Sequence, residues 1–257
     1  LSNDEALLGQ LFQYRIASGD ASLEGHSFGN LFISALAEIT GSFEEAVAES
    51  GRVLGVQGRV LPSTLQDVRL SADVLLPNTT LEVRVEGESK IPLSRGRIRR
   101  VWLEPSNPPA FPRAIHALLN ADLIILGPGS LYTSILPNLL VPDLGEAVKS
   151  SRALKLLICN VATQPGETDG FSCGDHLRAI EEHLGSGLFE LAIVNHQYLG
   201  KLPENVQWVE VDKDLDDDFP IYRADLIDNM HPWRHDSQKL AQVIMDLYSE
   251  RTGPLVE

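Results

Sequence analysis

The stretch LIILGPGSLYTSILPNLLVP, residues 123–142, indicates the fold class of this 257-residue chain. It begins with an apolar run that stops at Gly-Pro-Gly, residues 127–129. The next hydroxyl-bearing residues are Ser130, Tyr132, Thr133 and Ser134. A short apolar run that is bounded by glycines and leads into helical spacing is typical of a buried strand joined to a helix. The stretch therefore predicts a strand over 122–126 and a helix over 131–140.

The second half of the chain repeats this alternation of strand and helix. Further strands are expected over 155–161 and 190–194. Further helices are expected over 143–151, 173–185 and 237–250. The strands are almost continuously apolar, as expected when helices cover both faces of a sheet, and their alternation with helices predicts parallel strands. We therefore expect an α/β fold with a doubly wound, mostly parallel sheet and helices on both faces.

The first half of the chain has a different pattern. Helices are expected over 4–16, 29–39, 43–51 and 111–120. Strands are expected over 53–60, 68–75, 81–86 and 97–104, and a further one over 207–211. The strands between about 53 and 104 are richer in polar residues and are joined by turns, which indicates a small antiparallel β excursion. No internal repeat or long linker is visible, so we expect a single domain over 1–257 with an insertion.

Composition limits the classes of ligand and partner. The formal net charge is −15. Nucleic-acid binding depends on neutralising phosphates with Lys and Arg, so a nucleic-acid partner is disfavoured. No apolar run approaches the ~20 residues that cross a bilayer, so membrane insertion is not expected. Cys159 and Cys173 form no C-x-x-C pair, which favours a reducing cytoplasm. A homodimer is expected only from the frequency of two-fold oligomers.

Polar segments at the ends of three expected strands predict a ligand site. These segments are GPGSLYTS (127–134), NVATQPGET (160–168) and NHQY (195–198). In open α/β sheets, ligands gather at the carboxyl ends of the strands. Gly127 and Gly129 allow a phosphate to approach the backbone, and Ser130 is placed to cap a helix whose free N–H groups favour an anion. The alternative is a tight turn with a good cap, but the polar ends of the other strands favour a ligand.

Other polar groups have both a functional and a structural interpretation. GHSFGN (25–30) is either a second wall of the site or the entry to a helix. Thr163 contacts a ligand or belongs to a turn at Pro165-Gly166. Asn195 follows a buried strand, where its amide is placed to bind a base or a sugar hydroxyl. Tyr198 is placed to stack on a nucleobase, although surface tyrosines are common.

The segment HPWRHD (231–236) adds positive charge before the last expected helix. Arg234 is interpreted as a fixed cation for a pyrophosphate, or else as a surface charge. His231 and His235 stand four residues apart, but Pro232 and the lack of other clustered ligands disfavour a metal, so no metal site is expected. No pair of nucleophile and base is visible, so catalytic residues are unassigned.

Several long motifs resemble those of one family. They are GHSFGN, GRVLPST (58–64), GESKI (87–91), ADLIILGPGSLYTSILPNLLV (121–141) and NVATQPGETDGFS (160–172). Together they resemble the CofD/YvcK family over nearly the whole chain. The tyrosine-bearing GPGSLYTSILPNLLV and the TQPGET segment are closer to the YvcK branch, the gluconeogenesis factors.

The resemblance implies a Rossmann-like α/β core and two possible functions. Proteins of the YvcK branch are cytoplasmic, bind UDP-sugars such as UDP-N-acetylglucosamine, and are linked to cell shape and cell-wall synthesis during gluconeogenic growth. No secure catalytic reaction goes with them. The CofD branch implies the alternative, which is transfer of a 2-phospholactyl group from a guanylyl donor to a deazaflavin with release of GMP. Either nucleotide would bring Mg²⁺ with its diphosphate.

The resemblance also assigns site residues by position. The family's shared polar positions match His26, Gly29, Asn30, Gly127, Gly129, Ser130, Asn138, Asn160, Thr163 and Asn195. Tyr198 and Arg234 match loops that face the sugar nucleotide in the YvcK branch, and Ser237 matches a position that can carry a phosphorylatable hydroxyl. Both branches begin with a strand, a Gly-rich loop and an Asp-Asp-Gly-Gly-type segment. We expect this part of the site to be missing from the chain.

Overall fold

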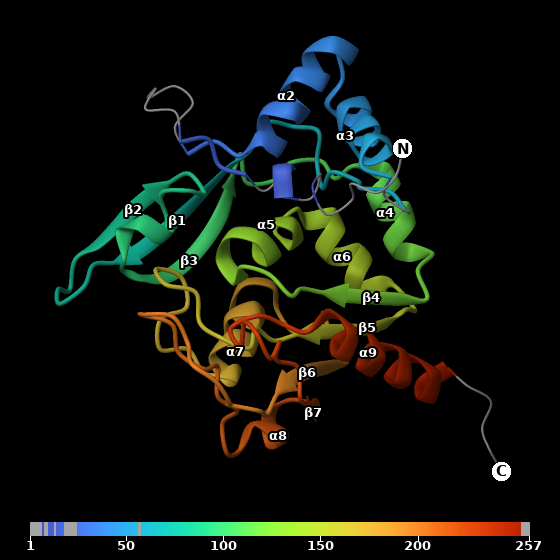
Figure 1. Ribbon diagram of the computed structural model, residues 1–257. Coiled ribbons are helices and arrows are strands. Elements are labelled where there is room, and N and C mark those ends of the chain that lie inside the picture. Colours follow the sequence, from blue (N-terminus) through green and yellow to red (C-terminus); the bar gives the residue numbers. More distant parts are fainter. Residues whose placement is uncertain (1–6, 8–9, 13, 18–24, 56–57, 253–257) are drawn as a thin grey trace. The chain divides into compact units, whose positions relative to one another are not determined.

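The computed structural model describes residues 7, 10–12, 14–17, 25–55 and 58–252. The chain divides into two compact units, residues 1–65 and residues 66–257 (Figure 1). That these units act as one domain stays a prediction.

The first unit contains the two helices α2 (Phe28–Thr40) and α3 (Phe43–Val53). The helix α2 begins where the Ser27 hydroxyl accepts a hydrogen bond of 3.2 Å from the amide of Asn30. Gly29 lets this helix pack closely on Phe12, because a Cβ at Gly29 would lie 3.0 Å from the Phe12 carbonyl oxygen. Both helices confirm the expectation from the sequence.

Two other expectations in the first unit have different outcomes. The expected strand over 53–60 is wrong, because α3 continues to Val53 and residues 58–60 belong to no strand. Residues 56–57 lie outside the described residues. Of the helix expected over 4–16, residues 7 and 10–12 are helical and 14–16 are not, while the remainder lies outside the described residues.

The second unit begins with a small antiparallel sheet. Its strands are β1 (Arg69–Leu75), β2 (Glu82–Glu86) and β3 (Arg97–Glu104), in the order β2-β1-β3. Their apolar side chains alternate with polar ones, so that Ala72, Val74 and Ile98 are buried in the core. The pairing of β1 with β3 shifts between Asp73 and Val74. This sheet confirms the expected antiparallel excursion.

The core of the second unit is a four-stranded parallel sheet. Its strands are β4 (Leu123–Leu126), β5 (Leu154–Ile158), β6 (Leu191–Asn195) and β7 (Ile221–Ala224). They lie in sequence order, as Figure 1 shows. The strand expected over 207–211 is wrong, because this segment makes only an isolated bridge between Ala162 and Trp208. The place next to β6 belongs to β7, whose exposed edge residues do not form an apolar run.

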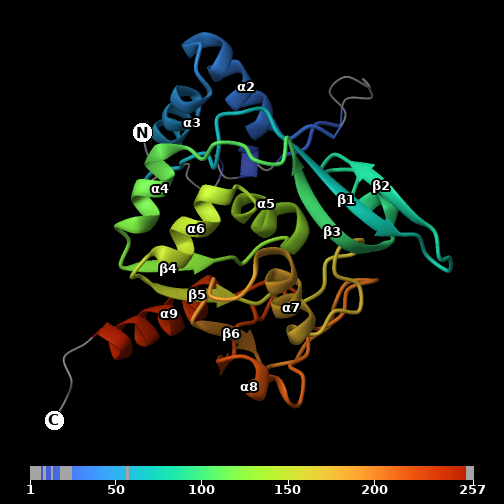
Figure 2. The ribbon, with the colours of Figure 1, turned by 180° about the vertical axis from the view of Figure 1, so that it is seen from behind.

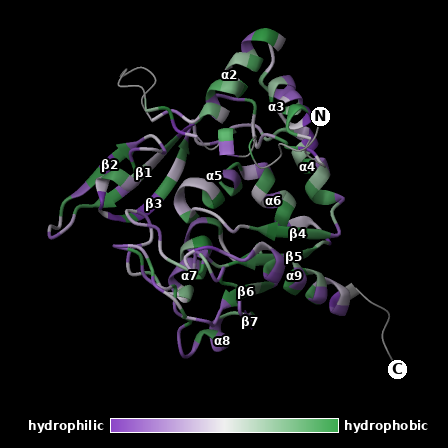
Figure 3. Cartoon of the chain, in the orientation of Figure 1, coloured by the Kyte–Doolittle hydropathy of each residue, from purple (hydrophilic) through white to green (hydrophobic). Residues whose placement is uncertain are grey.

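Helices cover both faces of the parallel sheet, as the two views in Figures 1 and 2 show. The helices on one face include α6 (Pro142–Ser150) and α7 (Cys173–Leu184), and Leu157 packs in the same cluster as Leu177. On the other face, Leu156 packs in a cluster with Leu240 of α9 (Ser237–Thr252). Figure 3 shows β4 and β5 as predominantly hydrophobic. The expected α/β class is therefore confirmed.

The remaining elements of the second unit are short helices that lie between its strands. They are η1 (Pro92–Ser94), α4 (Pro112–Leu119), η2 (Leu131–Ile135), α5 (Leu136–Leu139) and α8 (Leu215–Asp218). The helix expected over 131–140 is present, but it begins as a wide π-type turn in which the Ile135 amide donates to the Ser130 carbonyl (2.8 Å). Within the described residues, none of the helices has the length and apolar character that crossing a membrane requires.

Candidate functional site

The Gly-Pro-Gly segment forms the tight exit from β4. Gly127 has a φ of +86°, and a Cβ there would lie 3.1 Å from the Ile158 carbonyl oxygen of β5. Residues with a side chain rarely adopt this backbone conformation, and β5 leaves little space for a Cβ. Both the positive φ and the close approach of β5 therefore favour glycine at this position. Gly127 therefore has a structural role in joining β4 to η2.

A carboxylate of the chain itself lies at the start of η2. Ser130 makes no capping hydrogen bond with its side chain, and its hydroxyl instead accepts from Gln164 Nε2 (2.8 Å). Thr133 Oγ1 donates to Glu167 Oε1 (2.9 Å). Burial raises the pKa of the Glu167 carboxyl, although hydrogen bonds from Thr133 and from the Tyr132 amide act in the opposite direction. Glu167 thus takes the place that we expected for an external anion at this helix start.

A cavity of about 490 Å³ opens beside Gly129, at the carboxyl ends of β4 and β5. We call it the main cavity. Its lining includes Gly129, Asn160, Thr163, Gln164, Trp233 and Arg234. Four of these six residues were expected site residues, and they come from three separate segments of the chain. The volume lies within the range of ~300–1,000 Å³ that is usual for small-molecule sites.

Hydrogen bonds hold the walls of the main cavity together. Asn160 Nδ2 donates to the Gly129 carbonyl (2.9 Å), which ties the end of β5 to the loop after β4. Thr163 pairs with Gln207 through its backbone amide (2.8 Å) and through its hydroxyl, which accepts from the Gln207 amide (2.9 Å). These bonds fix the backbone, so the loops that face the cavity are preorganised.

Arg234 projects from a tight turn that is anchored at both ends. Its amide donates to the His231 carbonyl (2.8 Å), and its own carbonyl accepts from the Asp228 amide (3.0 Å). His235 Nε2 donates to the Cys159 carbonyl of the sheet (3.2 Å). Burial lowers the pKa of His235, which keeps this ring neutral near pH 7. In the described chain, the exposed Arg234 guanidinium makes no hydrogen bond or ion pair.

Asn195 and Tyr198 are close to each other but do not line the main cavity. Asn195 is buried, with its Nδ2 donating to the Gln197 carbonyl (2.6 Å) and its Oδ1 accepting from the Leu226 amide (3.2 Å). The Tyr198 hydroxyl donates to the Asn195 carbonyl (3.2 Å) and accepts from the Val211 amide (3.1 Å). Both side chains therefore join loops rather than present free polar atoms.

The other expected site residues belong to other elements of the chain. His26, Gly29 and Asn30 belong to the first unit, where GHSFGN forms the entry to α2. Asn138 is on α5 and donates to the Ser134 carbonyl (2.7 Å). Ser237 is the exposed first residue of α9, and its phosphorylation stays a prediction.

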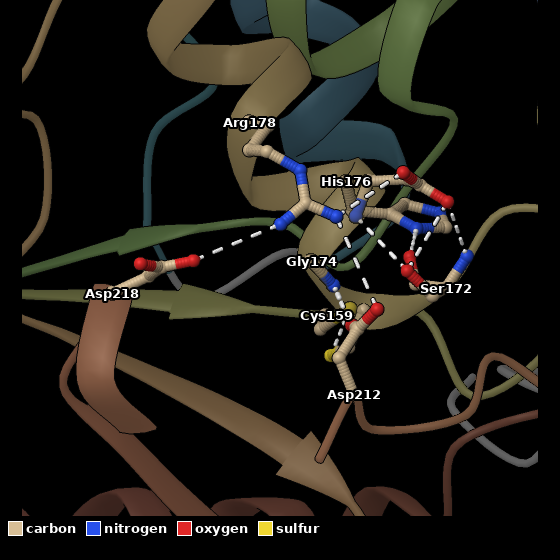
Figure 4. A network of polar contacts seen from close by, with 9 residues as sticks. Cys159, Ser172, Gly174, His176, Arg178, Asp212 and Asp218 are labelled. Carbon is tan, nitrogen blue, oxygen red and sulfur yellow. Dashed lines mark hydrogen bonds and ion pairs between the residues drawn. The ribbon is translucent and has the colours of Figure 1, made fainter. Parts of the chain in front are cut away.

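A second polar cluster lies at the start of α7 (Figure 4). Arg178 forms ion pairs with Asp175 (3.3 Å), Asp212 (3.9 Å) and Asp218 (3.9 Å). The Gly174 amide donates to Asp212 Oδ2 (2.7 Å). These contacts fasten α7 to the segment 212–218, so the charged groups of this cluster are paired with one another. We call it the Arg178 cluster, and its role is structural.

Metal-binding groups do not gather in the described residues, where no three His, Cys, Asp or Glu side chains are placed to hold an ion. The lining of the main cavity in particular includes no Asp or Glu. Mg²⁺ binds through carboxylates and phosphates, so these residues do not form a magnesium site of their own.

The fold and the main cavity define a doubly wound α/β protein with a small-molecule cavity at the carboxyl ends of its parallel strands. The chain belongs to the CofD family, whose model, described as 2-phospho-L-lactate transferase CofD, matches residues 1–251. This confirms the family that the motifs resemble.

Similar proteins carry the name of the YvcK branch. The gluconeogenesis factor of Bacillus subtilis is 41% identical over 97% of this chain and 80% of its own length. A relative from Nostoc sp. is 44% identical over 96% of this chain, which spans 56% of that relative's length. A crystal structure of a UPF0052 family member from Bacillus halodurans has a TM-score of 0.81 and 37% identity, covering 93% of this chain and 78% of the other.

Proposed function

We propose that the main cavity binds a nucleotide sugar, such as UDP-N-acetylglucosamine, and that the protein acts as a regulator of cell shape and cell-wall synthesis during gluconeogenic growth. The observation that carries this proposal is the meeting of Gly129, Asn160 and Arg234 around one cavity of about 490 Å³. The relatives named gluconeogenesis factor support the same role.

Arg234 is the residue that we assign to the diphosphate. A guanidinium binds phosphate oxygens through two parallel hydrogen bonds, and Arg234 has no competing carboxylate bonded to it within the described chain. The formal net charge of −15 repels anions over most of the surface. An anionic ligand therefore needs a local cation, and the Arg234 turn supplies one beside the cavity.

The other walls suit the neutral parts of a nucleotide sugar. Gly129 leaves the backbone accessible, and Trp233 offers an aromatic surface beside Arg234. Asn160 uses its Nδ2 for Gly129, and its Oδ1 is an acceptor for a ribose or sugar hydroxyl. Thr163 and Asn195 enter the proposal as residues that hold the loops in place.

The lining of the main cavity favours ligand binding over catalysis of a reaction. Among its described lining residues, the main cavity has no carboxylate to serve as a general base. The proposal also involves no protein-bound Mg²⁺.

The family description favours one alternative, transfer of a 2-phospholactyl group to a deazaflavin. That activity would release GMP when the chain is mixed with a guanylyl donor, a deazaflavin and Mg²⁺. Turnover in this assay would replace the regulatory proposal with an enzymatic one.

Isothermal titration calorimetry of UDP-N-acetylglucosamine binding tests the main proposal. We expect Arg234→Gln to weaken binding at least about tenfold, because a hydrogen bond to a charged group contributes ~1.5–3 kcal/mol. The matched control is Arg152→Gln, which removes an exposed arginine from the opposite, amino-terminal end of β5. Equal affinities for the native chain and Arg234→Gln would remove Arg234 from the site, and no binding by the native chain would refute the proposal.

A further inference from the structure

A second cleft lies along the loop that carries the TQPGET segment. It has a volume of about 320 Å³ and lies between the turn at 95–97 and the segment 167–175. Its lining includes Arg95, Gly96, Arg97, Glu167, Asp169 and Gly170. We call it the Arg95 cleft. Its position is distinct from the main cavity, because the two share no lining residue.

The two arginines of this cleft have no internal partner. Within the described residues, neither Arg95 nor Arg97 makes a side-chain hydrogen bond or an ion pair, and both side chains are exposed. In a chain with a formal net charge of −15, acidic partners are abundant. Arg178, for example, pairs with three aspartates. Arg95 and Arg97 line the same cleft without an ion-pair partner in the described chain, which makes them candidate groups for binding an anion.

The backbone holds these arginines in place. Arg95 ends the turn η1 with a φ of +50°, and its amide donates to the Pro92 carbonyl (3.3 Å). Gly96 is buried against β1, where an added Cβ would collide with Val74 and the Leu75 carbonyl. Arg97 is the first residue of β3. The basic wall is thus built on the antiparallel sheet rather than on a loose loop.

The opposite wall is acidic and has acceptor atoms to offer. Asp169 is exposed and uses one oxygen, Oδ2, for the Gly166 amide (2.6 Å). Glu167 is 8% exposed, and its Oε2 is buried without a hydrogen-bond partner in the described chain, so the accessible acceptor on this wall is Asp169. Asp175, which also lines the cleft, is paired with Arg178. A complementary ligand therefore carries an anionic group at one end and hydroxyl donors at the other.

A third cleft borders both the Arg95 cleft and the main cavity. A cleft of about 460 Å³ shares Arg95 and Asp169 with the Arg95 cleft and shares Pro165 with the main cavity. Gly166 brings its two walls together, because an added Cβ would collide with the Pro92 carbonyl. Two ligands bound at the two ends would therefore lie along the same 164–170 loop.

We propose that the Arg95 cleft is a second ligand site that binds a small phosphorylated sugar or polyol, with the phosphate on Arg95 and Arg97 and a hydroxyl group on Asp169. A phosphate matches two guanidinium groups in charge and in geometry, and neighbouring hydroxyls match the free acceptor of Asp169. The site goes beyond the nucleotide site, and its occupant is a separate molecule.

Calorimetric titration of glucose 6-phosphate into the chain, at low ionic strength and without nucleotide, tests this proposal. We expect saturable binding that weakens at least about tenfold in the double variant R95Q/R97Q. The matched control R99Q/R100Q removes the same charge from the next two arginines of β3, which do not line the cleft. It should bind glucose 6-phosphate like the native chain.

Two further measurements test the acidic wall and the basic wall of the cleft separately. Asp169→Asn should weaken the binding of glucose 6-phosphate but not of sulfate, because sulfate has no hydroxyl to donate to Asp169. Free glucose should not bind, since it has no anionic group. Urea unfolding of each variant checks that the exposed substitutions leave the fold intact.

The proposal is overturned if glucose 6-phosphate does not bind, if R95Q/R97Q binds it as the native chain does, or if R99Q/R100Q loses as much affinity. Because the titration contains no UDP-sugar, its failure would leave the nucleotide proposal standing. Loss of UDP-sugar binding alone would likewise leave the proposal for the Arg95 cleft standing.

Discussion

The Arg178 cluster and the main cavity use arginine in opposite ways. Arg178 is surrounded by Asp175, Asp212 and Asp218, which tie α7 to the next segment of the chain. Arg234 stands beside a cavity and makes no hydrogen bond or ion pair in the described chain. The guanidinium of Arg178 is used in ion pairs that hold the fold together, whereas the guanidinium of Arg234 remains available to a ligand. Pairing, rather than residue type, therefore distinguishes a structural charge from a candidate binding group.

The largest expected effect is on the free energy of unfolding, when the backbone of the 164–170 loop is strained. Gly166→Ala places a Cβ against the Pro92 carbonyl at a φ of +83°. We expect a loss of about 3 kcal/mol in the free energy of unfolding, measured in urea, because steric conflict adds to left-handed strain. Gly170→Ala is the control, since it has a φ of +73° but no atom within 4 Å of the added Cβ. It should lose about 1 kcal/mol, and equal losses would show that no close contact exists at Gly166.

A smaller effect on the free energy of unfolding is expected when Arg178 and Arg234 are each replaced by glutamine. Arg178→Gln should lower the free energy of unfolding by about 1 kcal/mol, because it breaks a network of exposed ion pairs. Arg234→Gln should change it by less than about 0.5 kcal/mol, since no hydrogen bond or ion pair of the described chain is lost. Urea midpoints of the two variants measure the contrast. A larger loss for Arg234→Gln would mean that this residue is structural and would reverse the comparison.

The smallest effect concerns pH. Burial lowers the pKa of His176, His183 and His235 below the ordinary 6.5. Between the lowered pKa and 6.5 the unfolded chain binds more protons than the folded chain, so the free energy of unfolding falls as pH falls through that window. Glu167, whose pKa is raised above the ordinary 4.5, acts in the opposite direction at lower pH. We expect a lower urea midpoint at about pH 5.5 than at about pH 7.5.

His183 provides the test of this pH dependence. Its Nδ1 donates to the Ala179 carbonyl (2.7 Å), and its Nε2 accepts from the Val101 amide of β3 (3.1 Å). Protonation of Nε2 removes that acceptor, and nearby Arg100 disfavours the charged ring while Glu182 favours it. His183→Gln should therefore show a smaller change of the urea midpoint with pH than the native chain. An identical change would exclude His183 as a source of the dependence.

Much of the fold could be predicted because its signals are local. The apolar runs at β5 and β6 reflect burial at every position of these strands, and the helical spacing of α6 and α7 reflects burial along one face of each helix. The missed strand β7 is an edge strand with exposed Tyr222 and Arg223, so its sequence lacks an apolar run. The segment 207–211 misled the prediction in the opposite way. Its apolar residue Val209 is buried, but the segment forms only an isolated bridge and no strand.

The candidate site was predicted only in part for a related reason. Gly129, Asn160, Thr163 and Arg234 were expected from motifs, and all four line the main cavity. Trp233 and Glu167 were not identified, because nothing in the local sequence marks them. Tyr198 was expected to stack on a nucleobase; its hydroxyl bonds the backbone of Asn195 and Val211, and the stacking of its ring stays a prediction.

The class of fold and the family follow from the amino-acid sequence alone, because hydrophobic patterns and long motifs are properties of the order of residues. The strongly acidic composition likewise implies that any anion must be held locally. Which polar groups remain available depends on the three-dimensional structure. Glu167 and Thr133 lie 34 residues apart and meet at one helix start, whereas Arg95, Arg97 and Arg234 have no carboxylate partner in the described chain. Pairing between distant residues depends on three-dimensional position, and no local pattern carries that information.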